Sequence, residues 1–63
     1  MRRQYNWKVR ITYKLDGKIV KVRTYRARAS SSERAIGAVK DQFYREMSVY
    51  PDIVITDHRA ELA

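Results

Sequence analysis

The chain has 63 residues, a formal net charge of +7 and no cysteine. This length allows one small domain, residues 1–63, with a limited core. The lack of cysteine excludes disulfide bonds and thiolate metal sites, and it is typical of the reducing cytoplasm. No apolar run approaches the roughly 20 residues that span a bilayer, and no apolar segment follows the basic start at Arg2 and Arg3. We therefore expect a cytoplasmic protein that has no membrane partner.

The positive charge is concentrated in the first half of the chain. Residues 1–28 contain ten Lys or Arg residues and one acidic residue, whereas residues 29–63 contain four basic and six acidic residues. Such an asymmetry is typical of proteins that bind a polyanion or an acidic protein surface.

Residues 7–15, WKVRITYKL, alternate strictly between apolar and polar side chains. A period of two predicts a strand with one buried face. The dipeptide Asp16-Gly17 comes next, and it favours a two-residue hairpin turn because both of its residues tolerate a positive φ. Residues 18–28 are then predicted to form the returning strand.

A two-residue loop also predicts the register of this hairpin. The pairs on the core face would be Leu15 with Lys18, Tyr13 with Val20, Ile11 with Val22, Val9 with Thr24, and Trp7 with Arg26. The solvent face would pair Lys14 with Ile19, Thr12 with Lys21, Arg10 with Arg23, and Lys8 with Tyr25. A shift of one residue would exchange the two faces of the second strand, so this prediction depends on the turn.

Residues 31–47 change to a helical period. The apolar residues of this segment fall on one stripe, which consists of Ala35, Ile36, Val39, Phe43 and Met47. Ser30 and Glu33 have the spacing of a capping box, which predicts that the helix begins near Ser31. Gly37 lies in mid-helix, where it costs up to about 1 kcal/mol relative to Ala; it is either a tolerated imperfection or a point of close approach for a partner. Pro51 is predicted to end the helical region.

Residues 53–62, IVITDHRAEL, predict a last strand. We expect one set on the core side: Val54, Thr56, His58, Ala60 and Leu62. We expect the other set on the solvent side, although its two isoleucines argue against this: Ile53, Ile55, Asp57, Arg59 and Glu61. The predicted fold class is α+β, in the order β-β-α-β, with a three-stranded antiparallel sheet in the order 2-1-3 and one helix packed on one face.

The sequence shows no pattern typical of a catalytic or metal-binding site. His58 is the only histidine, and we interpret it as a residue at the edge of the core. Asp57 and Glu61 lie four residues apart on a strand, or about 13 Å, which is too far for a cooperating pair of carboxylates. Gly17 and Gly37 are too far apart to form a phosphate-binding loop. We therefore expect no enzymatic activity, no metal, no cofactor and no small-molecule substrate.

The candidate site is the basic face of the predicted hairpin. Its predicted members are Lys8, Arg10, Lys14, Lys21, Arg23 and Tyr25, with Arg26 and Arg28 in a second cluster near Arg2 and Arg3. A solvated sheet face must be polar, which is one explanation of this pattern. A face selected only for solubility mixes both signs of charge, however, and Arg10 opposite Arg23 is destabilising without a partner. Tyr25 offers a stacking platform for a base or a cation–π contact for Lys8.

The segment WKVRITYKLDGKIVKVRTYRARASSSERAIGAVKDQF resembles the β-β-α-β unit of the archaeal ribosomal protein LX family. The features that carry the resemblance are a DGK hairpin (residues 16–18), a YRA strand end (residues 25–27), an alanine-containing helix and an apolar third strand. This resemblance implies binding to ribosomal RNA.

The outline also resembles the family of small podophage inhibitors of bacterial RNA polymerase. The shared features are an aromatic residue, Trp7, at the start of the first strand, the helix at 31–47, the pair Tyr50-Pro51 and the VIT third strand (residues 54–56). This second resemblance implies a regulator that wedges against the polymerase.

We therefore predict a small basic binding module that associates with nucleic acid or a ribonucleoprotein. The alternative is a phage-type regulator that binds an acidic surface of a host protein such as RNA polymerase. A third possibility is a structural subunit or dimer formed by edge pairing of residues 18–28. The sequence leaves RNA, DNA and protein open as partners.

Overall fold

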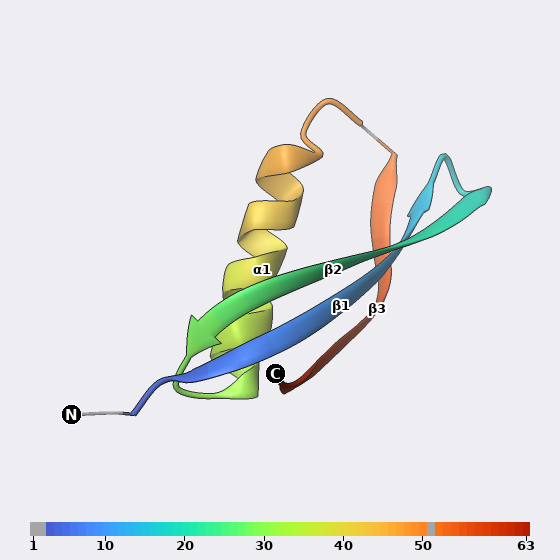
Figure 1. The fold of residues 1–63 in the computed structure, drawn as a ribbon. Coiled ribbons are helices and arrows are strands. Elements are labelled where there is room, and N and C mark those ends of the chain that lie inside the picture. The colour runs from blue at the N-terminus through green and yellow to red at the C-terminus, as the bar shows by residue number, and fades with distance from the viewer. Residues whose placement is uncertain (1–2, 51) are drawn as a thin grey trace.

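The computed structural model describes residues 3–50 and 52–63. Its elements are β1 (Tyr5–Leu15), β2 (Ile19–Ala29), α1 (Ser32–Glu46) and β3 (Ile53–Leu62). The strands form one antiparallel sheet in the order β2-β1-β3, and α1 packs on one face of it (Figure 1). The predicted β-β-α-β architecture is therefore confirmed. We call the face under α1 the helix side and the other face the open side. The expectations for Arg2 and Pro51 lie outside the described residues.

The core lies between β1 and α1, as the alternation and the helical stripe predict. Val9, Ile11 and Phe43 are fully buried. Tyr13 packs edge to face on Phe43, with ring centroids 4.9 Å apart and an interplanar angle of 60°, a favourable geometry for aromatic pairs. The other buried residues are Ala29, Ala35, Val39 and Met47.

The register of the hairpin differs by one residue from the prediction. Leu15 pairs with Ile19 and not with Lys18. Asp16 and Gly17 do adopt positive φ angles of 54° and 68°, and the Lys18 amide donates to the Leu15 carbonyl at 3.1 Å. Lys18 is thus an extra residue between the turn and β2, and it exchanges the two faces of β2.

The exchange has a physical cause in the last third of β2. The predicted register would put Arg26 on the helix side, and Arg28 with it, where burying an unpaired charge is costly. The observed register instead puts Tyr25, Ala27 and Ala29 against the core.

The helix N-cap is Ser31 and not Ser30. The Ser31 backbone is extended, and its Oγ accepts a hydrogen bond from the Arg34 backbone N–H at 3.3 Å. The predicted capping box of Ser30 and Glu33 is therefore wrong, because β2 continues to Ala29 and the turn into the helix comes one residue later. Glu33 still lies in the first turn, where a negative charge interacts favourably with the helix dipole.

A bulge in β3 explains how both isoleucines of this strand and the alternation of its second half can be accommodated. Thr12 of β1 pairs with Asp57, but Tyr13 pairs with Ile55, which leaves Thr56 between two register positions. The Thr56 Oγ1 donates a hydrogen bond to the Thr12 carbonyl at 3.2 Å. Such an extra residue switches the side on which the following residues lie.

The bulge changes the predicted sides for one end of β3 only. Ile53 and Ile55 lie on the helix side and pack against the core, and Val54 lies on the open side. The prediction for these three residues is wrong, because the bulge lets both isoleucines reach the core while the far end keeps its own alternation. At that far end the predicted sides agree with the observed pairing: Asp57, Arg59 and Glu61 on the open side, and His58, Ala60 and Leu62 on the helix side.

Candidate functional site

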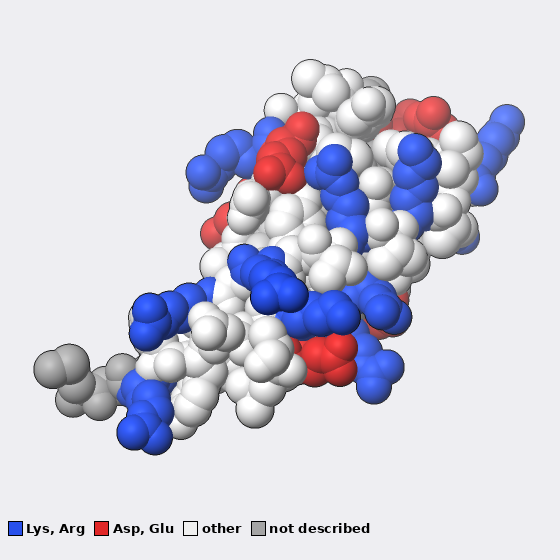
Figure 2. Space-filling view, viewed as in Figure 1, with Lys and Arg blue, Asp and Glu red and all other residues white. Residues whose placement is uncertain are grey.

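Six cations lie on the open side of the sheet. We define the basic face by these residues, which come from all three strands: Lys8, Arg10, Lys14, Arg26, Arg28 and Arg59. Two carboxylates, Asp57 and Glu61, share this side through β3. Figure 2, in which β1 and β2 lie in front of α1, shows Lys and Arg side chains spread along the length of the molecule with few acidic groups between them. The open side is therefore predominantly positive.

Like charges lie directly opposite one another on the basic face. Lys8 pairs with Arg26 on β2 and with Glu61 on β3, while Arg10 pairs with Thr24 and with Arg59. Like charges in such cross-strand positions are destabilising. Within residues 3–50 and 52–63 the one ion pair joins Arg23 to Glu46, so no member of the basic face forms one there. The repulsion on this face is not relieved by ion pairs within the described fold.

Three of the eight residues predicted for the site lie on the other side. Lys21 pairs with Tyr13, Arg23 with Ile11, and Tyr25 with Val9, so all three belong to the helix side. Their predicted place on the basic face is wrong because the register is shifted. The predicted pairs of Arg10 with Arg23 and of Lys8 with Tyr25 are therefore absent from the described sheet. The other five predicted residues are on the open side: Lys8, Arg10, Lys14, Arg26 and Arg28.

Arg59 is the member of the basic face that sequence reasoning missed. Its predicted position, on the same side of its strand as Asp57 and Glu61, is correct. What the sequence did not show is that the pairing of β3 with β1 brings Arg59 opposite Arg10. The alternation of β3, combined with the predicted strand order, is the signal that could have found it.

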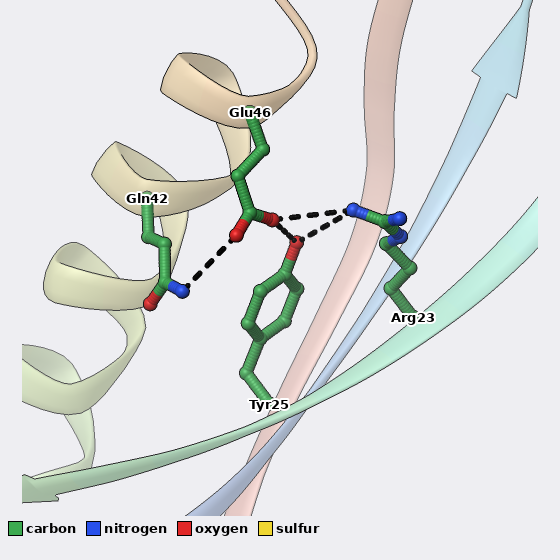
Figure 3. A network of polar contacts seen from close by, with 4 residues as sticks. All are labelled: Arg23, Tyr25, Gln42 and Glu46. Carbon is green, nitrogen blue, oxygen red and sulfur yellow. Dashed lines mark hydrogen bonds and ion pairs between the residues drawn. The ribbon is translucent and has the colours of Figure 1, made fainter.

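Arg23 and Tyr25 form a polar network with the end of α1 (Figure 3). The Tyr25 hydroxyl donates to Glu46 Oε1 at 2.8 Å, and Arg23 Nη1 donates to the same oxygen at 3.2 Å and to the Tyr25 oxygen at 3.3 Å. Gln42 Nε2 donates to the other carboxylate oxygen at 3.2 Å. This network connects β2 to α1 and neutralises Arg23.

The network shifts the protonation equilibria of its members. The hydrogen bond from Tyr25, followed by that from Gln42, holds the pKa of Glu46 below its ordinary value. Partial burial, followed by the hydrogen bond to Glu46, raises the pKa of Tyr25. Both groups therefore keep their hydrogen-bonding forms, carboxylate and phenol, at neutral pH.

The two ends of the sheet differ in chemistry. At the hairpin end, Val20, Val22 and Val54 are more than half exposed around Lys14. At the opposite end, a shallow and open hollow of about 500 Å³ is lined by Asn6, Trp7, Arg26, Ala27, Arg28 and Ala63. The Trp7 Nε1–H is not available there, because it donates to the Ala29 carbonyl at 3.0 Å. Arg26 and Arg28 are among the lining residues, and arginine favours an anionic occupant.

The described residues contain no group of three or more His, Asp or Glu side chains that could hold a metal ion. No helix among them has the length and apolar character needed to cross a membrane. His58, which pairs with Ile11, lies on the helix side of β3 and is exposed.

The chain matches no protein-family model, and searches of curated proteins and of solved structures returned no match. The resemblances to archaeal ribosomal protein LX and to the podophage polymerase inhibitors therefore stay predictions.

Proposed function

We propose that this protein is a non-catalytic module that binds the sugar–phosphate backbone of nucleic acid across the basic face. The observation that carries the proposal is the opposition of like charges on that face, Lys8 to Arg26 and Arg10 to Arg59, with no ion pair for any of them in the described residues. A chain of phosphates relieves this repulsion and releases counterions on binding.

The chemistry of the face favours backbone contacts over base stacking. None of the residues assigned to the open side of the sheet is aromatic. Tyr25, the one aromatic residue predicted for the site, has its hydroxyl engaged by Glu46 on the helix side. Without an aromatic platform, cations contact phosphate and position the strand, and they carry little sequence information. We therefore expect weak discrimination among sequences.

The dimensions of the face fit several phosphates. Lys8 and Lys14 lie six residues apart on β1, which corresponds to about 20 Å. Phosphates of one duplex strand follow one another every 3.4 Å along the helix axis, so this length spans about six of them and four contacts are within reach. Four contacts predict that log K falls with log salt at a slope of about −3.6 on duplex DNA.

The test is a titration of the protein with duplex and single-stranded oligonucleotides of DNA and RNA at three or more salt concentrations. Arg10→Gln removes a cation from the basic face, and Arg34→Gln removes an exposed cation from α1 with the same change in net charge. We expect Arg10→Gln to make the slope shallower by about 0.9 and to lower the affinity at low salt by about tenfold. Arg34→Gln should have little effect.

Two results would reject the proposal. The first is no measurable binding of any oligonucleotide at low salt. The second is an equal loss from Arg10→Gln and Arg34→Gln, since diffuse net charge and not the basic face would then attract the polyanion.

A second candidate function is binding to an acidic protein surface, as a regulator of a host protein. The observation that favours it is the exposed apolar group of Val20, Val22 and Val54 beside Lys14, because a mixed apolar and basic patch suits a protein interface. Capture from a lysate with and without nuclease distinguishes the two candidates. Partners that disappear after nuclease treatment support nucleic acid, and one protein retained after treatment supports the second candidate.

A further inference from the structure

We propose that β2 pairs antiparallel with β2 of a second copy of this chain, so that two three-stranded sheets join into one sheet of six strands. The edges of the sheet and the order of side chains along β2 favour this pairing, and nucleic-acid binding is not required for it.

The two edge strands are protected to different degrees. In the order β2-β1-β3, both β2 and β3 have one unpaired side. β3 carries a bulge and two exposed acidic residues, Asp57 and Glu61, which are common devices against edge pairing. β2 has 11 residues without a register shift, proline or acidic residue, and only its cations oppose the approach of another strand.

The outward backbone groups of β2 are available for such pairing. Among the described residues, the one hydrogen bond outside the sheet ladder that reaches the β2 backbone is that from Trp7 Nε1 to the Ala29 carbonyl, at its very end. An edge of this length with unpaired N–H and C=O groups is a template for another strand.

The order of side chains favours one register. A twofold axis perpendicular to the sheet through Thr24 pairs every residue of Ile19–Ala29 with a residue of the second copy. In this register no cation lies opposite a cation: Lys21 meets Ala27, Arg23 meets Tyr25, Arg26 meets Val22, and Arg28 meets Val20. Centring the axis on Arg23 opposes that residue to itself, and centring it on Tyr25 leaves Ile19 and Val20 unpaired. The register with the most pairs is therefore free of direct charge repulsion, which the cations on this edge would otherwise cause.

The contacts near the axis are favourable on both faces. On the open side, Thr24 meets Thr24 of the second copy, a cross-strand pair that contributes to sheet stability. On the helix side, Arg23 meets Tyr25 of the second copy, within reach of a cation–π contact. The side chains of Arg23 and Glu46 are 45% and 41% exposed. The network of Figure 3 would therefore lie beside the same network of the second copy, and in each network the charges of Arg23 and Glu46 cancel.

Salt separates this proposal from the proposed function. Each copy carries a formal charge of +7, so the two copies repel at low ionic strength, and added salt screens that repulsion. Self-association should therefore strengthen with salt, whereas polyanion binding weakens with it. Edge pairing buries less area than a standard interface, and we expect a dissociation constant on the order of 0.1 mM.

The first test is sedimentation of the nuclease-treated protein over a range of concentrations at low and high salt. We expect the mass to rise toward that of a dimer with concentration, more strongly at high salt. Val22→Arg places two Arg–Arg pairs in the interface and should abolish the dimer. Val54→Arg adds the same charge at the β3 edge, where the native side chain is similarly exposed (58% against 54%), and should keep the dimer.

The second test measures the register directly. The chain has no cysteine, so Thr24→Cys introduces a single thiol at the axis, where the separation of paired Cα atoms suits a disulfide. We expect oxidation to cross-link Thr24→Cys much faster than Val54→Cys. A monomer at every concentration and salt, a dimer that Val54→Arg disrupts and Val22→Arg does not, or equal cross-linking at positions 24 and 54 would each overturn the proposal. None of these results would affect polyanion binding by the monomer.

Discussion

The helix side and the open side of the sheet each carry an arginine near the middle of the hairpin, and the two arginines have different partners. Arg23, on the helix side, has an ion pair with Glu46 and a hydrogen bond to Tyr25. Arg10, on the open side, lies between Thr24 and Arg59 and has no ion pair in the described residues. Cations of the same hairpin therefore differ: Arg23 connects the sheet to the helix, whereas Arg10 has no ion pair in the described residues and, in our proposal, contacts a phosphate.

The largest expected effect on stability comes from removing the buried ring of Phe43, which α1 packs against the helix side of the sheet. Phe43 is fully buried, so Phe43→Ala should lower the free energy of unfolding by about 3–5 kcal/mol, which is comparable with the whole stability of a small domain. Urea unfolding followed by circular dichroism measures this. Tyr44→Ala, at a neighbouring exposed position, is the control and should change stability far less.

Phe43→Ala also tests whether the open side depends on the fold. Unfolding leaves the net charge unchanged but disperses the basic face. If the unfolded variant bound oligonucleotides as tightly as the native protein, the arrangement of the cations would be irrelevant to binding.

The next effect concerns the beginning of α1. Ser31→Ala removes the acceptor for the Arg34 amide and should lower stability by about 0.5–2 kcal/mol. Ser30→Ala, one residue earlier, should have a smaller effect because Ser30 does not cap the helix. The difference between the two urea midpoints checks the position of the cap, and the reverse order of effects would contradict it.

A smaller effect should separate the two arginines. Arg23→Gln breaks an exposed ion pair and should destabilise the protein slightly, with little change in oligonucleotide affinity. Arg10→Gln removes a like-charge pair and should leave stability level or raise it by a few tenths of a kcal/mol, while affinity falls. Urea midpoints and binding titrations on the same preparations measure both. If Arg23→Gln lowered the affinity and Arg10→Gln lowered the stability, the structure would have the wrong register for β2, and Leu15 would pair with Lys18.

The smallest effect is a pH dependence of the helix-side network. Because the folded pKa of Glu46 is lowered, its contribution to stability is present above the unfolded pKa, about 4.3, and is lost as the pH falls through the folded value. Because the folded pKa of Tyr25 is raised, its contribution is present below the unfolded pKa, about 10, and is lost as the pH rises through the folded value. Between pH 2 and pH 7, the urea midpoint of Glu46→Gln should fall less steeply with decreasing pH than that of the native protein. An unchanged slope in that variant would show that the network contributes nothing.

The sequence by itself determined the elements and their order. Strict alternation in residues 7–15, the Asp-Gly turn and the helical stripe of residues 35–47 each depend on local geometry, since a strand repeats every two residues and a helix every 3.6. These patterns, with the strand directions, were sufficient for the antiparallel β2-β1-β3 sheet with one covering helix. They also placed three cations of the basic face on the solvent side: Lys8, Arg10 and Lys14.

Only the tertiary structure decided which side each β2 residue faces. Either face of β2 contains both apolar and charged residues, so alternation alone does not choose between them, and one extra residue, Lys18, exchanges the two. The choice depends on α1, because packing Tyr25, Ala27 and Ala29 beneath the helix avoids burying Arg26 and Arg28. The β3 bulge has the same kind of cause: it brings Ile53 and Ile55 to a core that exists only after the helix has packed on the sheet. The composition of the site depends on the same tertiary packing. Arg23 and Tyr25 form hydrogen bonds with Glu46 and do not belong to the basic face, whereas Arg59 lies on it opposite Arg10.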